Sequence, residues 1–331
     1  MSTIRMGIIG AGWIAQEHRR VVDSVAEAEL VAICDLDGER ARALAGDSGA
    51  RVYTDWRDLL DTEDLGAVII AVPPAAHLEP AVTALGHGLP VYLEKPIART
   101  REDAAQIVAE AQRTGTVCAV GYQWHALDLL DDLPGVLAGQ QIGLLVGASI
   151  GPTQSRPWFV DMRAGGGNLL ERGSHHLDLV RTVAGDVVAV QAAAGRVRLA
   201  RSGGEAGDID DALTMMLELA SGALATVVVA WTRPGQPGSY GLDIVASDAT
   251  LRLALDPDFT LVGSSGGQPV SRRAASHPME RSMRRFLHAV SQNDPAAVVC
   301  TPSNAAGTLA VAIAAERALE TSRAVRVEEQ P

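Results

Sequence analysis

The chain has 331 residues, of which 47% are hydrophobic and 21% are charged, and its formal net charge is -12 with a pI near 5.1. This length suits two domains better than one hydrophobic core, and the composition is that of an ordinary globular protein. The acidic balance argues against nucleic-acid binding through a basic face and against attraction to anionic membranes.

The N-terminal residues MSTIRMGIIG contain no separate apolar segment ahead of a cleavage site, so no signal peptide is expected. No apolar run approaches the roughly 18 residues of a membrane helix. Cys34, Cys118 and Cys300 form no CxxC pair, and we interpret them as buried small hydrophobes in a reducing compartment. A cytoplasmic location is therefore expected.

Apolar strand-like runs alternate with helix-like segments over the first third of the chain. The expected strands are residues 4–10, 29–35, 67–72, 91–93 and 117–120, and the expected helices are residues 13–26, 39–45, 77–87 and 101–113. Continuous apolar strands separated by helices predict βαβ units and a doubly wound parallel sheet that is covered on both faces. The predicted dinucleotide-binding domain of α/β class covers residues 1–122.

The pattern changes after about residue 122. One marked helix is expected at residues 168–184, strand-like runs at 187–199, 212–219, 223–231, 241–246 and 250–255, and closing helices at 279–292 and 302–321. Short connections such as Ser221-Gly222 favour antiparallel pairing. The second domain, residues 123–331, is therefore predicted to be α+β with a largely antiparallel sheet, one face of which is available as a subunit interface.

The residues GAGWIA, which follow the first expected strand and open the first expected helix, fit the pattern G-x-G-x-x-G/A. Gly10 permits the tight turn, and Gly12 lets the backbone approach a pyrophosphate at the helix N-terminus. Asp35 ends the second strand, where an acid accepts hydrogen bonds from a ribose 2′-hydroxyl and favours NAD over NADP, although Arg40 one turn later weakens this preference. The alternative is a glycine turn in an unrelated α/β protein, with Asp35 as a helix cap.

Two further loops lie at the ends of expected strands. The loop AVPPAAH follows the third strand, and His77 in it is either a helix residue without a role or a neighbour of the cofactor. The run LPVYLEKP reads as a buried strand that ends in a charged pair before Pro96, which places an ammonium where ligands bind in open α/β sheets. The residues expected at the cofactor are Gly10, Gly12, Trp13, Ile14, Asp35, Ala71, Pro73, His77, Glu94 and Lys95.

The segment GGGNLLERGSHHLD, residues 165–178, combines glycines with acids and histidines on an expected helix. Asn168 is placed to cap that helix. Glu171, His175 and Asp178 recur at i, i+4 and i+7 and so share one face, where the acid can orient the imidazole.

Other interpretations of this segment stay open. The acid and the histidine form either a solvated pair or a pair of metal ligands, and no metal site is predicted because no further Cys or His stands at ligand spacing. His176 either contacts substrate or points away from the site. Gly173 inside a helix costs about 1 kcal/mol relative to alanine, which a close approach of another chain or a ligand would explain.

The motifs GAGWIA, ICD, AVPPAAH, EKP, VGYQW and GGGNLLERGSHHLD occur in an order and spacing that resembles the glucose–fructose oxidoreductase/inositol dehydrogenase (Gfo/Idh/MocA) family. The resemblance covers nearly the whole chain. It implies a Rossmann domain followed by an open-faced antiparallel sheet domain that builds homodimers or homotetramers. It also implies NAD(P)-dependent oxidation of a sugar, polyol or related hydroxy compound, with Lys95, Glu171 and His175 as catalytic residues and Asp178 as a further acid.

Two positions depart from the family pattern. Glu171 stands where the family usually has aspartate, and His125 stands where an arginine is common, which makes an acidic substrate less expected. The residues expected at the substrate are Tyr122, Gln123, Trp124, His125, Trp158, His176 and Asp178. For each aromatic residue among them, a place in the core is an equal alternative.

The predicted function is NAD-dependent hydride transfer between a secondary alcohol and the nicotinamide. His175 accepts the hydroxyl proton, Lys95 stabilises the developing alkoxide and Glu171 orients His175. One rival is an enzyme that recycles bound NAD to cleave glycosides or to epimerise, and another is a cofactor-binding regulator without chemistry. No nucleic-acid or membrane partner is predicted.

Overall fold

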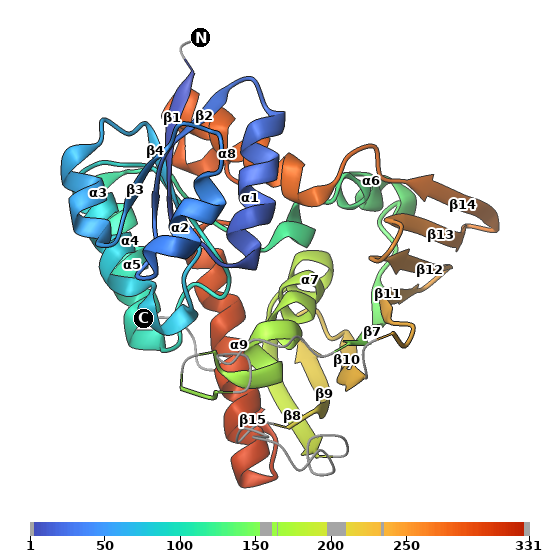
Figure 1. Cartoon of the computed structure of the whole chain (residues 1–331). Helices are drawn as coiled ribbons and strands as arrows, with labels where there is room; N and C mark the ends of the chain where they lie inside the picture. Colours follow the sequence, from blue (N-terminus) through green and yellow to red (C-terminus); the bar gives the residue numbers. More distant parts are fainter. Residues whose placement is uncertain (1–2, 153–160, 164, 197–209, 233–234, 328–331) are drawn as a thin grey trace. The chain divides into compact units, whose positions relative to one another are not determined.

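A computed structural model describes residues 3–152, 161–163, 165–196, 210–232 and 235–327 of the chain (Figure 1). The chain divides into two compact units. Unit 1 comprises residues 1–126 and 278–306, and unit 2 comprises residues 127–277 and 307–331. The first boundary lies four residues beyond the predicted one, and the segment 278–306, which was assigned to the second domain, belongs to unit 1. The reason is that helix α8 (Pro278–Gln292) carries apolar side chains that join the core of unit 1.

Unit 1 is built on a six-stranded parallel sheet of order β3-β2-β1-β4-β5-β6. Its strands are β1 (Ile4–Ile9), β2 (Ala28–Cys34), β3 (Arg51–Tyr53), β4 (Ala67–Ile70), β5 (Val91–Leu93) and β6 (Cys118–Val120). This order is that of a dinucleotide-binding Rossmann sheet, and it confirms the predicted α/β class. The short edge strand β3 was not predicted.

Helices cover both faces of this sheet (Figure 1). They are α1 (Trp13–Ser24), α2 (Gly38–Ala45), α3 (Trp56–Thr62), α4 (Leu78–Gly86), α5 (Arg101–Thr114) and α8, with short 3₁₀ turns η1 (Pro74–Ala76), η2 (Gln123–Ala126) and η6 (Pro295–Ala297). Apolar side chains of α1 and α8 share one buried cluster with the central strands. The returning segment of the chain thus completes a face that the first 126 residues leave unfinished.

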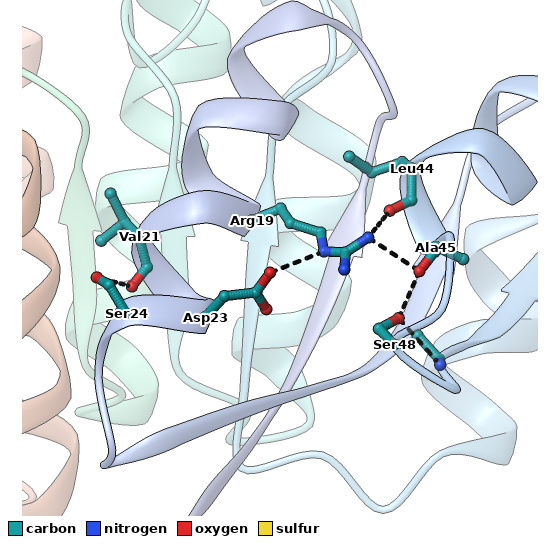
Figure 2. A network of polar contacts seen from close by, with 8 residues as sticks. Arg19, Val21, Asp23, Ser24, Leu44, Ala45 and Ser48 are labelled. Carbon is teal, nitrogen blue, oxygen red and sulfur yellow. Dashed lines mark hydrogen bonds and ion pairs between the residues drawn. The ribbon is translucent and has the colours of Figure 1, made fainter.

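An arginine on α1 ties that helix to the end of α2 (Figure 2). The Arg19 guanidinium donates to the carbonyls of Leu44 and Ala45, the latter at 2.9 Å, while its Nε donates to Asp23 at 3.1 Å. The last carbonyls of a helix have no partner inside the helix, so the arginine supplies one. The hydrogen bonds of Arg19 therefore fix α1, the helix that begins at the glycine turn, against the end of α2.

Unit 2 contains a nine-stranded sheet of order β14-β13-β12-β11-β7-β10-β9-β8-β15. Its strands are β7 (Ile142–Pro152), β8 (Val187–Gly195), β9 (Ala212–Leu219), β10 (Leu224–Thr232), β11 (Ser239–Ala246), β12 (Ala249–Ala254), β13 (Thr260–Ser265), β14 (Gln268–Arg273) and β15 (Val325–Arg326). All pairs are antiparallel except β7 with β10, which confirms the largely antiparallel prediction. The strand β7 was missed, although it lies at the centre of the sheet.

The helices of unit 2 are α6 (Asp128–Leu137), the turn η4 (Leu169–Gly173), α7 (Ser174–Ala184) and α9 (Pro302–Thr321), whose first five residues belong to unit 1. Helix α7 contacts β7 and β10 on the inner face of the sheet. The opposite face exposes large apolar side chains, which are Leu144, Val146, Met216, Leu224, Val245 and Val262. We call these six residues the outer apolar face.

The helix predicted over residues 168–184 begins instead with a π-helical turn, η4. The amide of Ser174 bonds to the carbonyl of Leu169, five residues earlier, and the side chain of Asn168 makes no capping bond, so its predicted capping role is wrong. Gly173 lies close to the sheet, because a Cβ there would be 3.6 Å from Met215 and 3.7 Å from Val229. These are ordinary van der Waals distances, so the contact with the sheet does not by itself require glycine, and both alternatives for Gly173 stay predictions.

Within the described residues, no helix combines the length and the apolar character needed to span a bilayer.

Candidate active site

The glycine turn joins the ends of three strands in unit 1. Gly10 has φ +99°, and its amide donates to the carbonyl of Cys34 at 2.7 Å. A Cβ on Gly10 would lie 2.4 Å from the carbonyl oxygen of Ala71, so only glycine fits. At Gly12, by contrast, a Cβ would meet no chain atom within 4 Å. The two glycines therefore have different causes: Gly10 is required by the fold, and Gly12 leaves open space at the N-terminus of α1.

This difference predicts opposite effects of two alanine substitutions. Gly10→Ala is expected to lower the free energy of unfolding by about 3 kcal/mol, because of the steric clash and the positive φ. Gly12→Ala should leave the free energy of unfolding unchanged, because the added methyl group meets no chain atom. It should raise the Kd for NAD about tenfold, because the methyl group keeps the pyrophosphate away from the backbone. A tenfold change in Kd corresponds to the binding free energy of about one hydrogen bond. Urea denaturation and calorimetric titration with NAD measure the two effects. An unfolding defect in Gly12→Ala would contradict the assignment.

Asp35 braces the glycine turn from the end of β2. Its Oδ2 accepts a hydrogen bond from the amide of Ala11 at 2.8 Å, and its Oδ1 accepts from the amide of Asp37 and from Arg40, both at 2.9 Å. Oδ1 thus already accepts two hydrogen bonds, whereas Oδ2 accepts one and has a second lone pair that can still accept from a ribose hydroxyl. Arg40 also pairs with Asp37 at 3.3 Å, which leaves the guanidinium opposed by two carboxylates.

The loop after β4 is braced by His77, which is fully buried. One ring nitrogen lies 2.9 Å from the carbonyl of Val72 and the other 3.2 Å from that of Ile97, so the imidazole links the loops after β4 and β5. Burial lowers the pKa of His77, although these carbonyls partly oppose the shift. The structure thus gives His77 a structural role, and its contact with a cofactor stays a prediction.

The charged pair Glu94-Lys95 follows β5 directly, as predicted. Lys95 is half-buried, whereas Glu94 is 7% exposed and its Oε1 lies 2.7 Å from His18 Nε2 on α1. Pattern reasoning missed His18 as a site residue. The signal was present, because His18 falls on the same helical face as the buried Ala15 and Val22.

The acid–histidine segment lies in unit 2. Glu171 in η4 and His175 in the first turn of α7 are both half-buried. Asp178 is 1% exposed and accepts a hydrogen bond from Thr308 of α9 at 3.2 Å. Since Lys95 belongs to unit 1, its action together with His175 stays a prediction.

His176 faces the sheet of unit 2. Its Nε2 lies 3.1 Å from the carbonyl of Gly241, and a Cβ on Gly147 would be 2.9 Å from its ring. Burial lowers the pKa of His176 from the ordinary 6.5 to about 4. This placement favours the alternative in which His176 points away from the site, and its substrate contact stays a prediction.

The buried His176 predicts a pH dependence of stability. Between pH 6.5 and 4 the unfolded chain binds more protons than the folded one, so the stabilisation is present above pH 6.5 and is lost as the pH falls toward 4. Between pH 7.5 and 5 the expected loss from this group is about 2 kcal/mol. Urea denaturation at both pH values should show a smaller change in His176→Gln than in the wild type. The exposed His288 gives the control, and an identical pH dependence in His176→Gln and His288→Gln would contradict the prediction.

The residues after β6 lie largely inside unit 1. Tyr122 is 1% exposed and Trp124 is 9% exposed, while Gln123 and His125 are half-buried. Turn η2 contacts α8, and Arg281 donates to the carbonyl of Ala126 at 2.8 Å. Burial favours the core alternative for both aromatic residues, and their substrate contacts stay predictions. Trp158 lies outside the described residues.

The sheet order of unit 1 and its glycine turn define a dinucleotide-binding protein of the Rossmann class. A model of the oxidoreductase family with an NAD-binding Rossmann fold matches residues 4–122, and a model of the GFO/IDH/MocA C-terminal domain matches residues 146–267. The chain belongs to the GFO/IDH/MocA oxidoreductase family. This result confirms the resemblance and the NAD cofactor.

Relatives and solved structures agree with this assignment. Inositol 2-dehydrogenase 3 of Saccharopolyspora erythraea is 30% identical over 274 residues, which cover 80% of this chain and 77% of the relative. The 2,7-anhydro-N-acetylneuraminate hydratase of Mediterraneibacter gnavus is 27% identical and covers 89% of this chain and 84% of its own. An Agrobacterium radiobacter oxidoreductase in complex with NAD+, L-tartaric acid and magnesium has a TM-score of 0.85 at 20% identity, covers 98% and 99% of the two chains, and shows a shared fold.

Proposed function

We propose that the protein is an NAD-dependent dehydrogenase that oxidises a secondary alcohol of a sugar, polyol or inositol-like substrate. The observation that carries the proposal is the position of Lys95 two residues after the end of β5, at the carboxyl end of a sheet with a dinucleotide-binding turn. Its relation to an inositol 2-dehydrogenase at 30% identity supports the substrate class.

The described residues of unit 1 fit the cofactor. Gly12 leaves open space at the N-terminus of α1, and the first turn of that helix carries no acidic residue that would repel phosphates. Gly10, Gly12 and Asp35 would hold the dinucleotide, and NAD supplies the hydride acceptor when it is bound. Asp35 favours NAD over NADP because a 2′-phosphate would meet its carboxylate, while Arg40 is already opposed by two acids.

The chain's own residues would handle the proton and the developing charge. We assign to His175 the removal of the hydroxyl proton and to Lys95 a hydrogen bond to the same oxygen. Glu171 would orient the imidazole from four residues earlier. The π-helical turn supports a site role for this segment, since such turns are frequent at functional positions.

Lys95 is the only lysine in the chain. The other 27 of the 28 Lys and Arg residues are arginines. An ammonium is a compact charge on a flexible stem, whereas a guanidinium is a planar fork that is always protonated. The presence of a lysine at this one position of an arginine-rich chain supports a function that needs a primary amine.

The test is a screen for NADH production over inositols, aldoses and amino sugars, run with NAD and with NADP. Turnover of at least one alcohol, faster with NAD, is the expected result. Asp35→Ser should reduce that preference for NAD. A protein that binds NAD but reduces it with none of these alcohols would contradict the dehydrogenase proposal.

A second candidate is an enzyme that recycles its bound NAD without net reduction. The relative named as a hydratase, which matches 89% of this chain, favours it. In that case NAD would stay bound through purification, and glycoside or anhydro-sugar substrates would be consumed without accumulation of NADH. Product analysis by mass spectrometry separates the two candidates.

We also propose that the outer apolar face of unit 2 forms a contact between copies of the chain. Exposed apolar side chains gathered on one sheet face mark an interaction surface. Met216→Glu, at a side chain that is 58% exposed, should convert the assembly to smaller species in sedimentation velocity. An unchanged sedimentation coefficient would count against this face as the contact.

A further inference from the structure

The charged pair that precedes Pro96 is anchored to α1 by a buried histidine. His18 is fully buried, and its Nε2 lies 2.7 Å from Glu94 Oε1, whose residue is 7% exposed. A carboxylate accepts and never donates, so the ring nitrogen carries the hydrogen. A charge-assisted hydrogen bond of this length between buried groups has a defined geometry, which places the Glu94 carboxylate.

The second carboxylate oxygen reaches forward to the lysine. Glu94 Oε2 accepts a hydrogen bond from the backbone amide of Lys95 at 3.1 Å. The carboxylate lies against Gly121, where a Cβ would be 3.1 Å from Oε1 and 3.4 Å from Oε2. The amide of Gly121 also bonds to the carbonyl of Leu93 at 2.8 Å. Glycine at position 121 thus provides the space in which Glu94 lies between His18 and Lys95.

The histidine is itself fixed by an aromatic contact. Its ring meets that of Tyr92 edge to face, with centroids 5.2 Å apart, and Tyr92 meets Phe286 of α8 at 5.5 Å. The Tyr92 hydroxyl lies 2.9 Å from Ser282 Oγ. The imidazole is therefore packed against Tyr92, which Phe286 and Ser282 of α8 hold in turn, and this packing restricts its rotation away from Glu94.

The carboxylate stays ionised in this buried place. Burial raises the pKa of Glu94, but the hydrogen bond and charge of His18, followed by the charge of Lys95, lower it further than burial raises it. Removing His18 would leave the buried Glu94 carboxylate without one of its hydrogen-bond donors. The free-energy cost of such an incompletely paired buried charge is larger than the net stabilisation that the pair provides. Such a carboxylate would move toward water or take up a proton, and either change weakens its hydrogen bond to the Lys95 amide.

We propose that His18 is a positioning residue that acts through Glu94 to hold the backbone, and hence the ammonium, of Lys95. The inference rests on the proposed function only for the part that Lys95 plays in turnover. The geometry of the three residues can be tested without any substrate.

The single lysine makes the test specific. Reductive methylation with ¹³C-formaldehyde labels the Lys95 amine and the N-terminus, and a spectrum of Lys95→Arg assigns the lysine signal. His18→Leu removes the donor, whereas His18→Gln retains an N–H that can reach Glu94. His87, an exposed residue that follows α4, gives the control His87→Leu.

We expect His18→Leu to shift and broaden the Lys95 signal and to lower kcat about 10- to 100-fold, since a displacement of 1 Å at a reacting group can cost that much. The KM for NAD should change little. His18→Gln should restore the wild-type signal and most of the kcat, and His87→Leu should resemble the wild type. An unchanged Lys95 signal in His18→Leu, or a His18→Gln protein that behaves like His18→Leu, would overturn the proposal.

A second variant decides the matter if His18→Leu does not fold. Gly121→Ala inserts a methyl group against the Glu94 carboxylate and leaves His18 in place, so it too must shift the Lys95 signal. A normal signal in a folded Gly121→Ala protein would overturn the proposal. A shifted signal in a protein that oxidises no alcohol at all would uphold the positioning role and reject the dehydrogenase function.

Discussion

Lys95→Ala is expected to lower turnover by a factor of about 100 or more and to leave NAD binding nearly intact. The ammonium follows β5, whereas the glycine turn and Asp35 follow other strands, so removing the amine leaves the described dinucleotide-binding residues unchanged. Steady-state kinetics on the alcohol found in the screen gives kcat, and calorimetric titration gives the Kd for NAD.

Lys95→Arg is the informative companion, because it keeps the positive charge and exchanges a compact ammonium for a planar fork. We expect it to bind NAD and to remain severely impaired. The exposed Arg272 of unit 2 gives a control for the loss of one positive charge. Normal turnover in Lys95→Ala would remove this lysine from the mechanism.

His175→Ala should produce a loss of similar size, about 100-fold or more in kcat, because the hydroxyl proton then has no base near it. Added imidazole should restore part of the activity by occupying the space of the missing ring. Glu171→Gln should have a smaller effect, since the imidazole would remain but lose an orienting carboxylate. Full activity in His175→Ala would show that another group takes the proton.

The double variant Lys95→Ala/His175→Ala tests whether the two residues act on one oxygen. If they do, the combined loss should fall well short of the product of the single losses, as for catalytic groups that function as a unit. A purely multiplicative loss would indicate that the two side chains act independently.

The parallel sheet of unit 1, apart from the short strand β3, was predictable because its strands contain apolar runs, such as AVII in β4. The strand β7 was not, since IGLLVGASIGP contains three glycines and no regular alternation. Those glycines have partners far along the chain. Gly147 makes room for the ring of His176, and a Cβ on Gly151 would clash with Tyr240. A local pattern contains no information about such partners.

The site was predictable where its residues stand next to a strand end and not where they lie on the inside of a helix. Asp35 and the pair Glu94-Lys95 could be placed because each directly follows a run of apolar residues. His18 occupies a core position of α1 and differs from its apolar neighbours only by a hydrogen bond to a residue 76 positions away. The π-helical turn before α7 could not be foreseen either, because its backbone bond from Ser174 to Leu169 has no counterpart in the local sequence pattern.

Unit 1 is built from two separate segments of the chain, and this affects when it can fold during synthesis on the ribosome. The first 126 residues emerge early, but the helix that completes their core begins only at Pro278, after the 151 residues from 127 to 277 have been made. Until then the nascent Rossmann sheet exposes the surface that Phe286 and Met283 later cover. A translation intermediate of this kind exposes apolar surface and is therefore expected to be prone to aggregate. Supplying residues 278–306 on a separate peptide is a way to rescue a truncated first unit.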